Sequence, residues 1–270
     1  MMKRPWSLLA RPLSFVVNAW ARFSSGEGKL APVRETAIVV GAYFTYMFVR
    51  KVIVPDASGI GLDNAVSVIN AEKSLGIFWE PQLQSWFAGV GDGALLFFNY
   101  LYIFTFFPIV LSSAAILYMV NRKRYLYYRG MILLSFAAAL LFFAAYPLAP
   151  PRFMEFTGII DSIVVHGPAW YSSRDAAVFY NEYAAMPSLH FSWTLLWGFV
   201  YWRSGPRILK VLGVLYPTAT FFAIVVTGNH YMLDAVGGAG MMVVVFFLYR
   251  YLLSGRLSRP PTAPAREALG

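Results

Sequence analysis

The chain has 270 residues, of which 59% are hydrophobic and only 13% are charged, and its mean hydropathy is +0.57. Ordinary soluble domains carry about 25% charged residues, so this composition excludes them and indicates an integral membrane protein. The sequence contains no cysteine, which excludes disulfides and thiolate chemistry. The net charge of +9 does not indicate nucleic-acid binding, because the basic residues gather between apolar segments.

The first 34 residues are predicted to form a basic interfacial segment on the cytoplasmic side. Leu9, Leu13 and Val16 recur at helical spacing, which is typical of a helix lying in the membrane interface. Arg11 interrupts the apolar run that a signal peptide would need. The alternative interpretation of this segment is a disordered basic tail.

Residues 35–253 are predicted to form one membrane domain, because no internal repeat or domain boundary divides them. A helical span needs about 20 mainly apolar residues to cross a bilayer. Six segments meet this requirement, at 36–54, 94–120, 130–149, 188–203, 211–229 and 232–253. The expected fold is therefore all-α and integral to the membrane, a six-transmembrane-helix bundle.

The distribution of basic residues predicts how this bundle is oriented. If both termini are cytoplasmic, the inner segments 1–35, 121–129, 203–210 and 250–270 hold 17 of the 22 Lys and Arg residues. Cytoplasmic loops are enriched in Lys and Arg, so this orientation is expected. Residues 254–270 are then a disordered cytoplasmic tail.

Two long loops are expected on the extracytoplasmic or lumenal side. In the first, residues 55–93, the side chains of Leu62, Val66 and Ile69 share one helical face, which predicts a short amphipathic helix lying on the membrane. The second, residues 150–187, is interrupted by Pro and Gly and is expected to be irregular.

Three polar motifs fall where predicted spans meet this outer side. They are YPLAPPRF at 146–153, AAMPSLHFSW at 184–193 and TGNHYMLDAVGG at 227–238. The motifs place Arg152, His190, His230 and Asp234 at one membrane depth. Ionisable groups at this depth are costly and indicate a functional site.

The residue types in these motifs favour phosphoryl transfer. On a helix beginning near His230, Asp234 lies four residues further on, where its carboxylate can orient the imidazole and raise the basicity of the free nitrogen. His230 is then a candidate nucleophile, His190 a candidate general acid, and Arg152 a cation suited to phosphate.

Several structural interpretations compete with this one. His190 could satisfy a carbonyl at a helix start, His230 and Asp234 could be a pair between helices, and Arg152 could be an interfacial anchor. A metal site is also conceivable, but Arg152 would repel the cation and no third strong ligand is evident. No metal or other cofactor is expected.

The motifs resemble a known family. MPSLH and HYMLD are similar to the second and third signatures of the type 2 phosphatidic acid phosphatase (PAP2) superfamily, and NEYAAMPSLHFSW with PLAPPR resembles its inositol phosphorylceramide synthase (Aur1-like) branch. The resemblance implies a six-span helical bundle without a metal cofactor, in which His230 forms a phosphohistidine. It further implies phosphate contacts by Ser188, with Asn181 and Tyr231 as additional candidates.

The sequence departs from the phosphatase pattern in its cations. Position 224 is Ile where that pattern has an Arg, and Arg152 is the only cation in YPLAPPRF, although Arg174 could supply a second one. Fewer cations suit a phosphodiester, with about one negative charge, better than a monoester, with about one and a half to two.

The expected function is therefore a membrane phosphotransferase that moves a phospho-headgroup, for example of the phosphoinositol type, to a lipid alcohol at the outer leaflet. Its expected partners are a phospholipid donor and a lipid or polyprenyl alcohol acceptor. Two alternatives stay open, a lipid or polyprenyl phosphate phosphatase and a non-enzymatic lipid-binding or transport protein.

Overall fold

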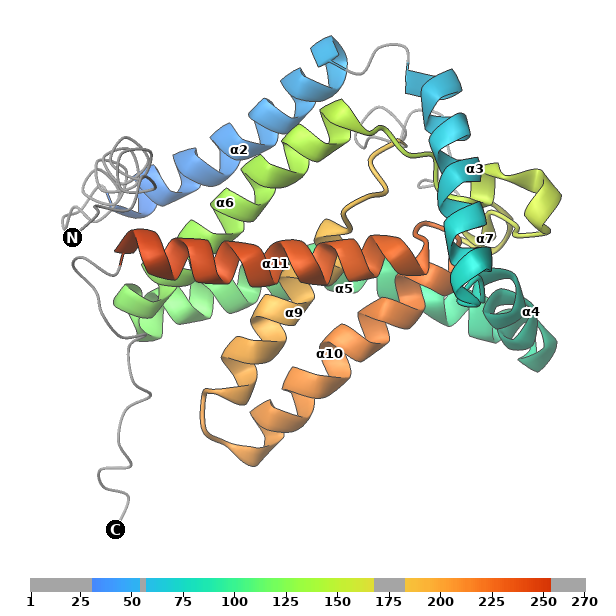
Figure 1. Ribbon diagram of the computed structural model, residues 1–270. Helices are drawn as coiled ribbons and strands as arrows, with labels where there is room; N and C mark the ends of the chain where they lie inside the picture. Colours follow the sequence, from blue (N-terminus) through green and yellow to red (C-terminus); the bar gives the residue numbers. More distant parts are fainter. Residues whose placement is uncertain (1–30, 54–56, 168–182, 254–270) are drawn as a thin grey trace, which may run out of the picture.

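A computed structural model describes residues 31–53, 57–167 and 183–253 (Figure 1). The predicted interfacial helix falls before Ala31 and the predicted tail after residue 253, so both lie outside the described residues. The described part is helical, and its only pairing of extended backbone is an isolated bridge between Leu148 and Ala184. The helices are α2 (Ala31–Ile53), α3 (Ala57–Leu75), α4 (Glu80–Val90), α5 (Asp92–Val120), α6 (Arg122–Ala145), η1 (Pro151–Phe153), η2 (Glu155–Thr157), α7 (Ser162–His166), α9 (Leu189–Trp202), α10 (Arg207–Val226) and α11 (Met232–Leu253).

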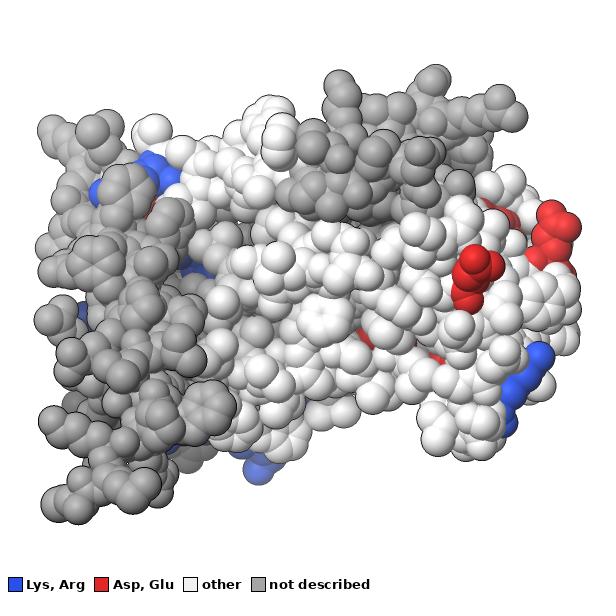
Figure 2. All heavy atoms as spheres, turned by 45° about the horizontal axis from the view of Figure 1, so that its top comes forward, with Lys and Arg blue, Asp and Glu red and all other residues white. Residues whose placement is uncertain are grey.

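Four helices of the described part are long and apolar enough to cross a membrane, namely α5, α6, α10 and α11. The other two predicted spans coincide with α2 and α9, of which α9 has only 14 residues. Figure 2 shows a broad band of uncharged surface in the middle of the visible face, with acidic side chains gathered towards one end. A band of this kind suits the hydrocarbon core of a bilayer.

The predicted cytoplasmic loop 121–129 is helical instead. Asn121 alone separates α5 from α6, and its Oδ1 accepts the N–H of Arg124 at 3.0 Å. Asn is favoured at this N-cap position because its side chain pairs an amide that the first helical turn leaves without a partner. The basic residues of 121–129 predicted a loop at the edge of the membrane, but from Arg122 onward they form the first turns of α6.

A buried ion pair joins α2 to α6 near this basic end of the molecule. Arg129 Nη1 donates to both carboxylate oxygens of Glu35 at 2.6 Å, and the Tyr125 hydroxyl donates to Glu35 Oε2 at 3.0 Å. All three side chains are buried. From the sequence, the basic residues of 121–129 indicated only the orientation of the chain, and this partner of Arg129 in α2 was not predicted.

Helices α9 and α10 form a tight hairpin. A Cβ at Gly213 would lie 2.6 Å from the carbonyl oxygen of Gly198, so only glycine permits this separation of the two backbones. Small residues allow such close approach between membrane helices. The contact helps to fix the relative positions of the His190 and His230 motifs, because α9 begins at the first and α10 leads into the second.

Two helices, α3 and α4, occupy the first outer loop, where the sequence predicted one short amphipathic helix. The buried face of α3 includes Ala65, Val68 and Ile69, whereas Leu62 and Val66 are exposed. Of the predicted apolar face, Ile69 packs into the protein, whereas Leu62 and Val66 stay on the surface of the described residues. In Figure 1, α3, α4 and α7 lie around the end of the bundle where α10 passes into α11.

Candidate active site

Three polar segments far apart in the sequence lie against one another at this end of the bundle. Gly228 adopts a φ of +71°, a conformation that favours glycine, and a Cβ there would lie 3.2 Å from the Cβ of Arg152. The segments are joined in pairs by backbone hydrogen bonds, from Leu148 N–H to the Tyr183 carbonyl at 2.8 Å, from Arg152 N–H to the Gly228 carbonyl at 3.0 Å, and from Ser188 N–H to the Asp234 carbonyl at 3.0 Å.

His230 lies in the turn between α10 and α11 and is held from one side. Its Nδ1 is 2.9 Å from the Ala185 carbonyl oxygen and 3.3 Å from Asp234 Oδ2. Both neighbours are hydrogen-bond acceptors, so Nδ1 carries the proton and the neutral imidazole keeps its lone pair on Nε2. A histidine oriented in this way can attack an electrophile through Nε2.

Asp234 is completely buried in the first turn of α11. Its Oδ2 also accepts the N–H of Tyr231 at 2.8 Å, which fixes the carboxylate against the turn that carries His230. The backbone and the imidazole therefore share one carboxylate oxygen. This arrangement orients the ring and can stabilise a positive charge on the imidazole.

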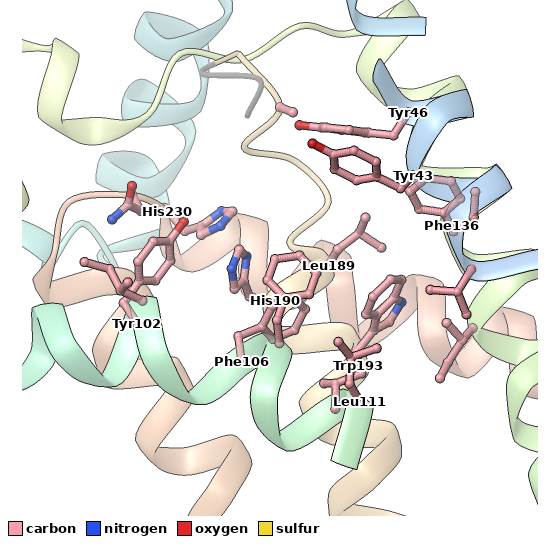
Figure 3. A pocket seen from close by; sticks show the side chains of 18 of the residues that line it. Tyr43, Tyr46, Tyr102, Phe106, Leu111, Phe136, Leu189, His190, Trp193 and His230 are labelled. Atoms are coloured by element: carbon pink, nitrogen blue, oxygen red, sulfur yellow. The ribbon is translucent and has the colours of Figure 1, made fainter. Parts of the chain in front are cut away.

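His190 approaches His230 from the start of α9. The two ring centroids are 5.8 Å apart, and His190 packs against the rings of Tyr102 and Phe106 at 4.8 and 4.1 Å (Figure 3). Within the described part of the chain, its ring nitrogens have no hydrogen-bond partner, and the ring lines a cavity together with His230. A phosphoryl group placed between the two imidazoles can meet one as nucleophile and the other as acid.

Arg152 supplies a fixed cation to the same cavity. Its Nε lies 3.0 Å from Asp161 Oδ2, and one Nη donates to Asn229 Oδ1. These two partners hold the guanidinium, and Asp161 offsets part of its charge. A guanidinium positioned in this way suits an oxyanion of low total charge.

The cavity that these residues share has a volume of about 990 Å³. Its walls come from α2, α5, α6, α9 and the motif loops, and most of the side chains that line it are apolar or aromatic. Arg152, Asn229, His190 and His230 give it one polar end. In the described residues, no group of three His, Asp or Glu side chains has the arrangement of a metal site.

The comparisons with known proteins agree with the motif geometry. A family model described as PAP2 superfamily matches residues 66–248, which include both histidines and the arginine. The chain belongs to the PAP2 superfamily. The match is to the superfamily and does not name a branch. Searches of curated proteins and of solved structures found no significant match.

The remaining candidates from the PAP2-like motifs lie further from the cavity. Ser188 is fully buried and caps α9, where its hydroxyl accepts the N–H of Phe191 at 3.3 Å. Tyr231 is fully buried in an apolar cluster with Ile69 and Leu148. Neither side chain is among those that line the cavity. Asn181 lies outside the described residues.

Two glutamates that the sequence interpretation missed support the PAP2 site from behind. Glu72 of α3 and Glu80 of α4 are completely buried, and they accept the N–H groups of Leu233 and Met232 at 2.7 and 2.8 Å. These amides belong to the first turn of α11, where N–H groups have no partner within the helix. The two carboxyl groups therefore anchor the turn that carries Asp234.

The second oxygens of Glu72 and Glu80 receive no N–H or O–H from other described residues, and the two carboxyl groups interact with each other. One proton shared between them would satisfy both oxygens. Burial, reinforced by the Glu80 carboxyl, raises the pKa of Glu72 from 4.5 to about 9, and burial also raises the pKa of Glu80. A sequence signal existed, because Glu72 falls three residues after Ile69 on the same helical face.

Proposed function

We propose that this PAP2 protein is an integral-membrane phosphotransferase that moves a phospho-headgroup from a phospholipid to a lipid or polyprenyl alcohol. The observation that carries the proposal is the pair of acceptors on His230 Nδ1, which leaves Nε2 as the nucleophilic nitrogen. His190 stands across the cavity and Arg152 supplies the cation. Membership of the superfamily supports chemistry on lipid phosphoesters.

The proposed reaction has two displacements at phosphorus. His230 Nε2 attacks the phosphorus, the bond from phosphorus to the lipid oxygen breaks, and protonated His190 gives its proton to that oxygen. The products are a lipid alcohol such as diacylglycerol and a phosphohistidine that carries the headgroup. In the second step His190 takes the proton of the acceptor hydroxyl, whose oxygen attacks phosphorus while the bond to Nε2 breaks.

Charge at the site favours a diester over a monoester. Of the described residues at this end of the cavity, Arg152 is the one permanent cation, and Asp161 lies 3.0 Å from it. A phosphodiester carries about one negative charge, whereas a monoester carries up to about two. A headgroup diester, for example of the phosphoinositol type found with Aur1-like enzymes, is therefore the better match in charge.

The PAP2 match also supports a second candidate, a lipid or polyprenyl phosphate phosphatase in which water is the acceptor. The acceptor dependence of the reaction separates the two functions. A transferase forms a new phospholipid only when a lipid alcohol is added, whereas a phosphatase releases inorganic phosphate without one. A non-enzymatic lipid-binding or transport protein would form neither product.

The test uses the purified full chain in nanodiscs with a headgroup-labelled phospholipid and an added lipid alcohol. His230→Ala is expected to lower the rate by roughly 10³-fold or more, as when one member of a cooperative catalytic set is removed. The matched control is His166→Ala, because this histidine of α7 does not line the cavity. Acid-labile phosphate on wild-type His230 is expected during turnover, and an unchanged rate in His230→Ala would overturn the proposal.

The role of His190 has its own test. His190→Ala is expected to lower transfer from an alkyl phosphodiester by about 10²- to 10⁴-fold, the usual contribution of a general acid. An aryl ester such as p-nitrophenyl needs little protonation of its leaving oxygen, so the loss with that substrate is expected to be much smaller. Equal losses with both leaving groups would contradict a general-acid role.

We further propose six spans, counting α2 and α9, with both termini cytoplasmic and the active site on the extracytoplasmic or lumenal side. The distribution of basic residues supports this orientation. Because the chain has no cysteine, single replacements report directly on sidedness. Lys73→Cys in α3 is expected to react with an impermeant maleimide from outside, whereas Lys123→Cys in α6 is expected to be protected, and both side chains are exposed.

A further inference from the structure

The cavity continues well beyond its polar end. Its volume of about 990 Å³ lies at the top of the roughly 300–1,000 Å³ range of ligand pockets, which is more than a phospho-headgroup needs. Figure 3 shows His190 and His230 on one side and Leu111, Phe136 and Trp193 further along. Past the histidines the cavity is therefore walled mainly by apolar and aromatic side chains.

The length of the cavity can be measured along the helices that line it. On α6, Phe143 and Arg129 both line the cavity, and their separation in sequence corresponds to about 21 Å at 1.5 Å per residue. On α5, Tyr102 and Ala114 both line it, and they lie about 18 Å apart by the same measure. The cavity thus runs along the bundle for most of the depth of one membrane span.

These dimensions match an extended hydrocarbon chain. A chain of alternating C–C bonds of about 1.5 Å advances about 1.25 Å for each carbon, so a length of about 20 Å accepts roughly sixteen carbons. The walls offer such a chain continuous apolar contact. The polar end of the same cavity holds His190, His230 and Arg152, to which the proposed function assigns the phosphate.

Polar groups line the far end of the cavity. Tyr125 and Arg129 line it there, and both are bonded to Glu35. A longer chain would have to separate the buried Arg129–Glu35 pair. Because the separated charges would not be hydrated there, their separation is strongly unfavourable. The Arg129–Glu35–Tyr125 cluster therefore forms a floor that limits the length of what the cavity accepts.

We infer that this cavity binds an apolar chain of the substrate lipid, with the phosphate at the histidines and the chain end at the floor formed by Arg129, Glu35 and Tyr125. The inference rests on the proposed function for the placement of the phosphate. It assigns the protein an upper limit in chain length of about sixteen carbons for the chain in the cavity. Helices α2, α5 and α6 thereby become determinants of lipid specificity.

The first test varies the chain length of the phospholipid donor from 8 to 22 carbons at a fixed fraction in nanodiscs. Hydrocarbon in a bilayer is already out of water, so fit to the cavity, and not burial itself, is expected to set the preference. The value of kcat/KM is expected to stay constant for chains of up to about sixteen carbons and to fall for longer chains. A flat profile to 22 carbons would overturn the inference.

A matched pair of variants sharpens this test. Ala114 lines the cavity, whereas its neighbour Ala115 is exposed on the outer face of α5 and does not line it. Ala114→Phe is expected to lower the ratio of kcat/KM for 16-carbon over 8-carbon donors by roughly tenfold, because a phenyl ring overpacks the far part of the cavity. Ala115→Phe is expected to leave the ratio at its wild-type value, and an unchanged ratio in both variants counts against the inference.

A second measurement does not depend on turnover. A 16-carbon phospholipid with a photoreactive diazirine at the end of its chain is expected to label residues near the floor, such as Tyr125 and Leu133. This labelling is expected to disappear in Ala114→Phe and to persist in Ala115→Phe. Labelling confined to the outer, lipid-facing side of the helices in all three proteins would overturn the inference.

The two assays separate the inference from the proposed function. Labelling at the floor without any transfer or hydrolysis supports the chain-binding cavity and rejects the proposed reaction. Transfer that depends on His230, but with no labelling at the floor and no length limit, supports the reaction and rejects the cavity as the place of the chain.

Discussion

Two buried polar clusters lie at opposite ends of one apolar cavity, and they are built differently. At the site end, His230 lies in a turn and is held by Asp234, in the first turn of α11, and by the Ala185 carbonyl of a loop distant in sequence. At the basic end, Arg129 and Glu35 meet directly from the sides of two regular helices. At the site end a helix and a loop together orient the imidazole. At the basic end two helices need only matching positions for their ion pair.

The comparison predicts that the two clusters respond differently to loss of a charge. At the site end the main loss is expected in rate, because the carboxylate of Asp234 fixes the tautomer of His230. At the basic end the main loss is expected in stability, because a single buried charge stays behind without its partner.

Asp234→Asn tests the site end and has the largest expected effect. The amide can donate to His230 Nδ1 and so favours the wrong tautomer, and the rate is expected to fall by about 10³- to 10⁴-fold. Turnover of labelled phospholipid in nanodiscs measures the change, with Asp63→Asn on the exposed face of α3 as control. A rate within tenfold of wild type would show that the carboxylate does not orient the nucleophile.

Arg129→Met tests the basic end. It leaves the Glu35 carboxylate buried without its cation, and the free energy of unfolding is expected to fall by about 3–5 kcal/mol. The double variant Arg129→Met with Glu35→Leu removes both charges and is expected to recover most of that loss. Denaturation in detergent measures both variants, and a double variant no more stable than the single one would contradict this account of the pair.

Glu72→Gln refines the description of the site end and has the smallest expected effect. In the folded wild type the pKa of Glu72 is raised to about 9, so the Glu72–Glu80 pair keeps a proton that the unfolded chain releases near pH 4.5. Its contribution to stability is therefore complete below pH 4.5 and is lost as the pH rises through about 9. Across this pH range the free energy of unfolding is expected to fall by about 1–3 kcal/mol, the cost of a buried group without its hydrogen bond.

Glutamine at position 72 keeps the acceptor for Leu233 and can donate to Glu80 at any pH. The variant is therefore expected to lose much of this pH dependence, as measured by unfolding at pH 6 and pH 9.5. Glu155→Gln, on an exposed 3₁₀ turn, serves as the control and is expected to follow the wild type. A Glu72→Gln variant that follows the wild-type profile would rule out the shared proton.

The sequence supported the membrane class, the helical fold and the family, since each depends on local or repeated features. Long apolar segments coincide with α5, α6, α10 and α11, and the motifs with Arg152, His190 and His230 lie within the PAP2 match. Helix boundaries were less predictable. The predicted loop 121–129 instead begins α6 at Arg122, where the Asn121 cap and the buried pair formed by Arg129 stabilise the helix.

The partners of the supporting side chains could not be read from sequence, because they are distant along the chain. Glu72 and Glu80 bind amides of α11 that lie about 150 residues further on, and no periodicity connects them. Asn229 lies inside a predicted motif, yet its contact with Arg152 depends on the fold of a second segment. Ser188 and Tyr231 stand next to the histidines in sequence, but their side chains turn into the protein interior.

By itself, the sequence determined that the chain is rich in long apolar helices, where most of them fall, and that two histidines, an aspartate and an arginine stand near helix ends. Those properties follow from composition and from the 3.6-residue period of a helix, which act over a few residues. The tertiary structure alone decided which nitrogen of His230 is free, which glutamates anchor its turn, and how deep the cavity runs. Those properties depend on contacts between segments far apart in the chain. A shift of a few ångströms between two such segments would change the hydrogen-bond partners of these side chains.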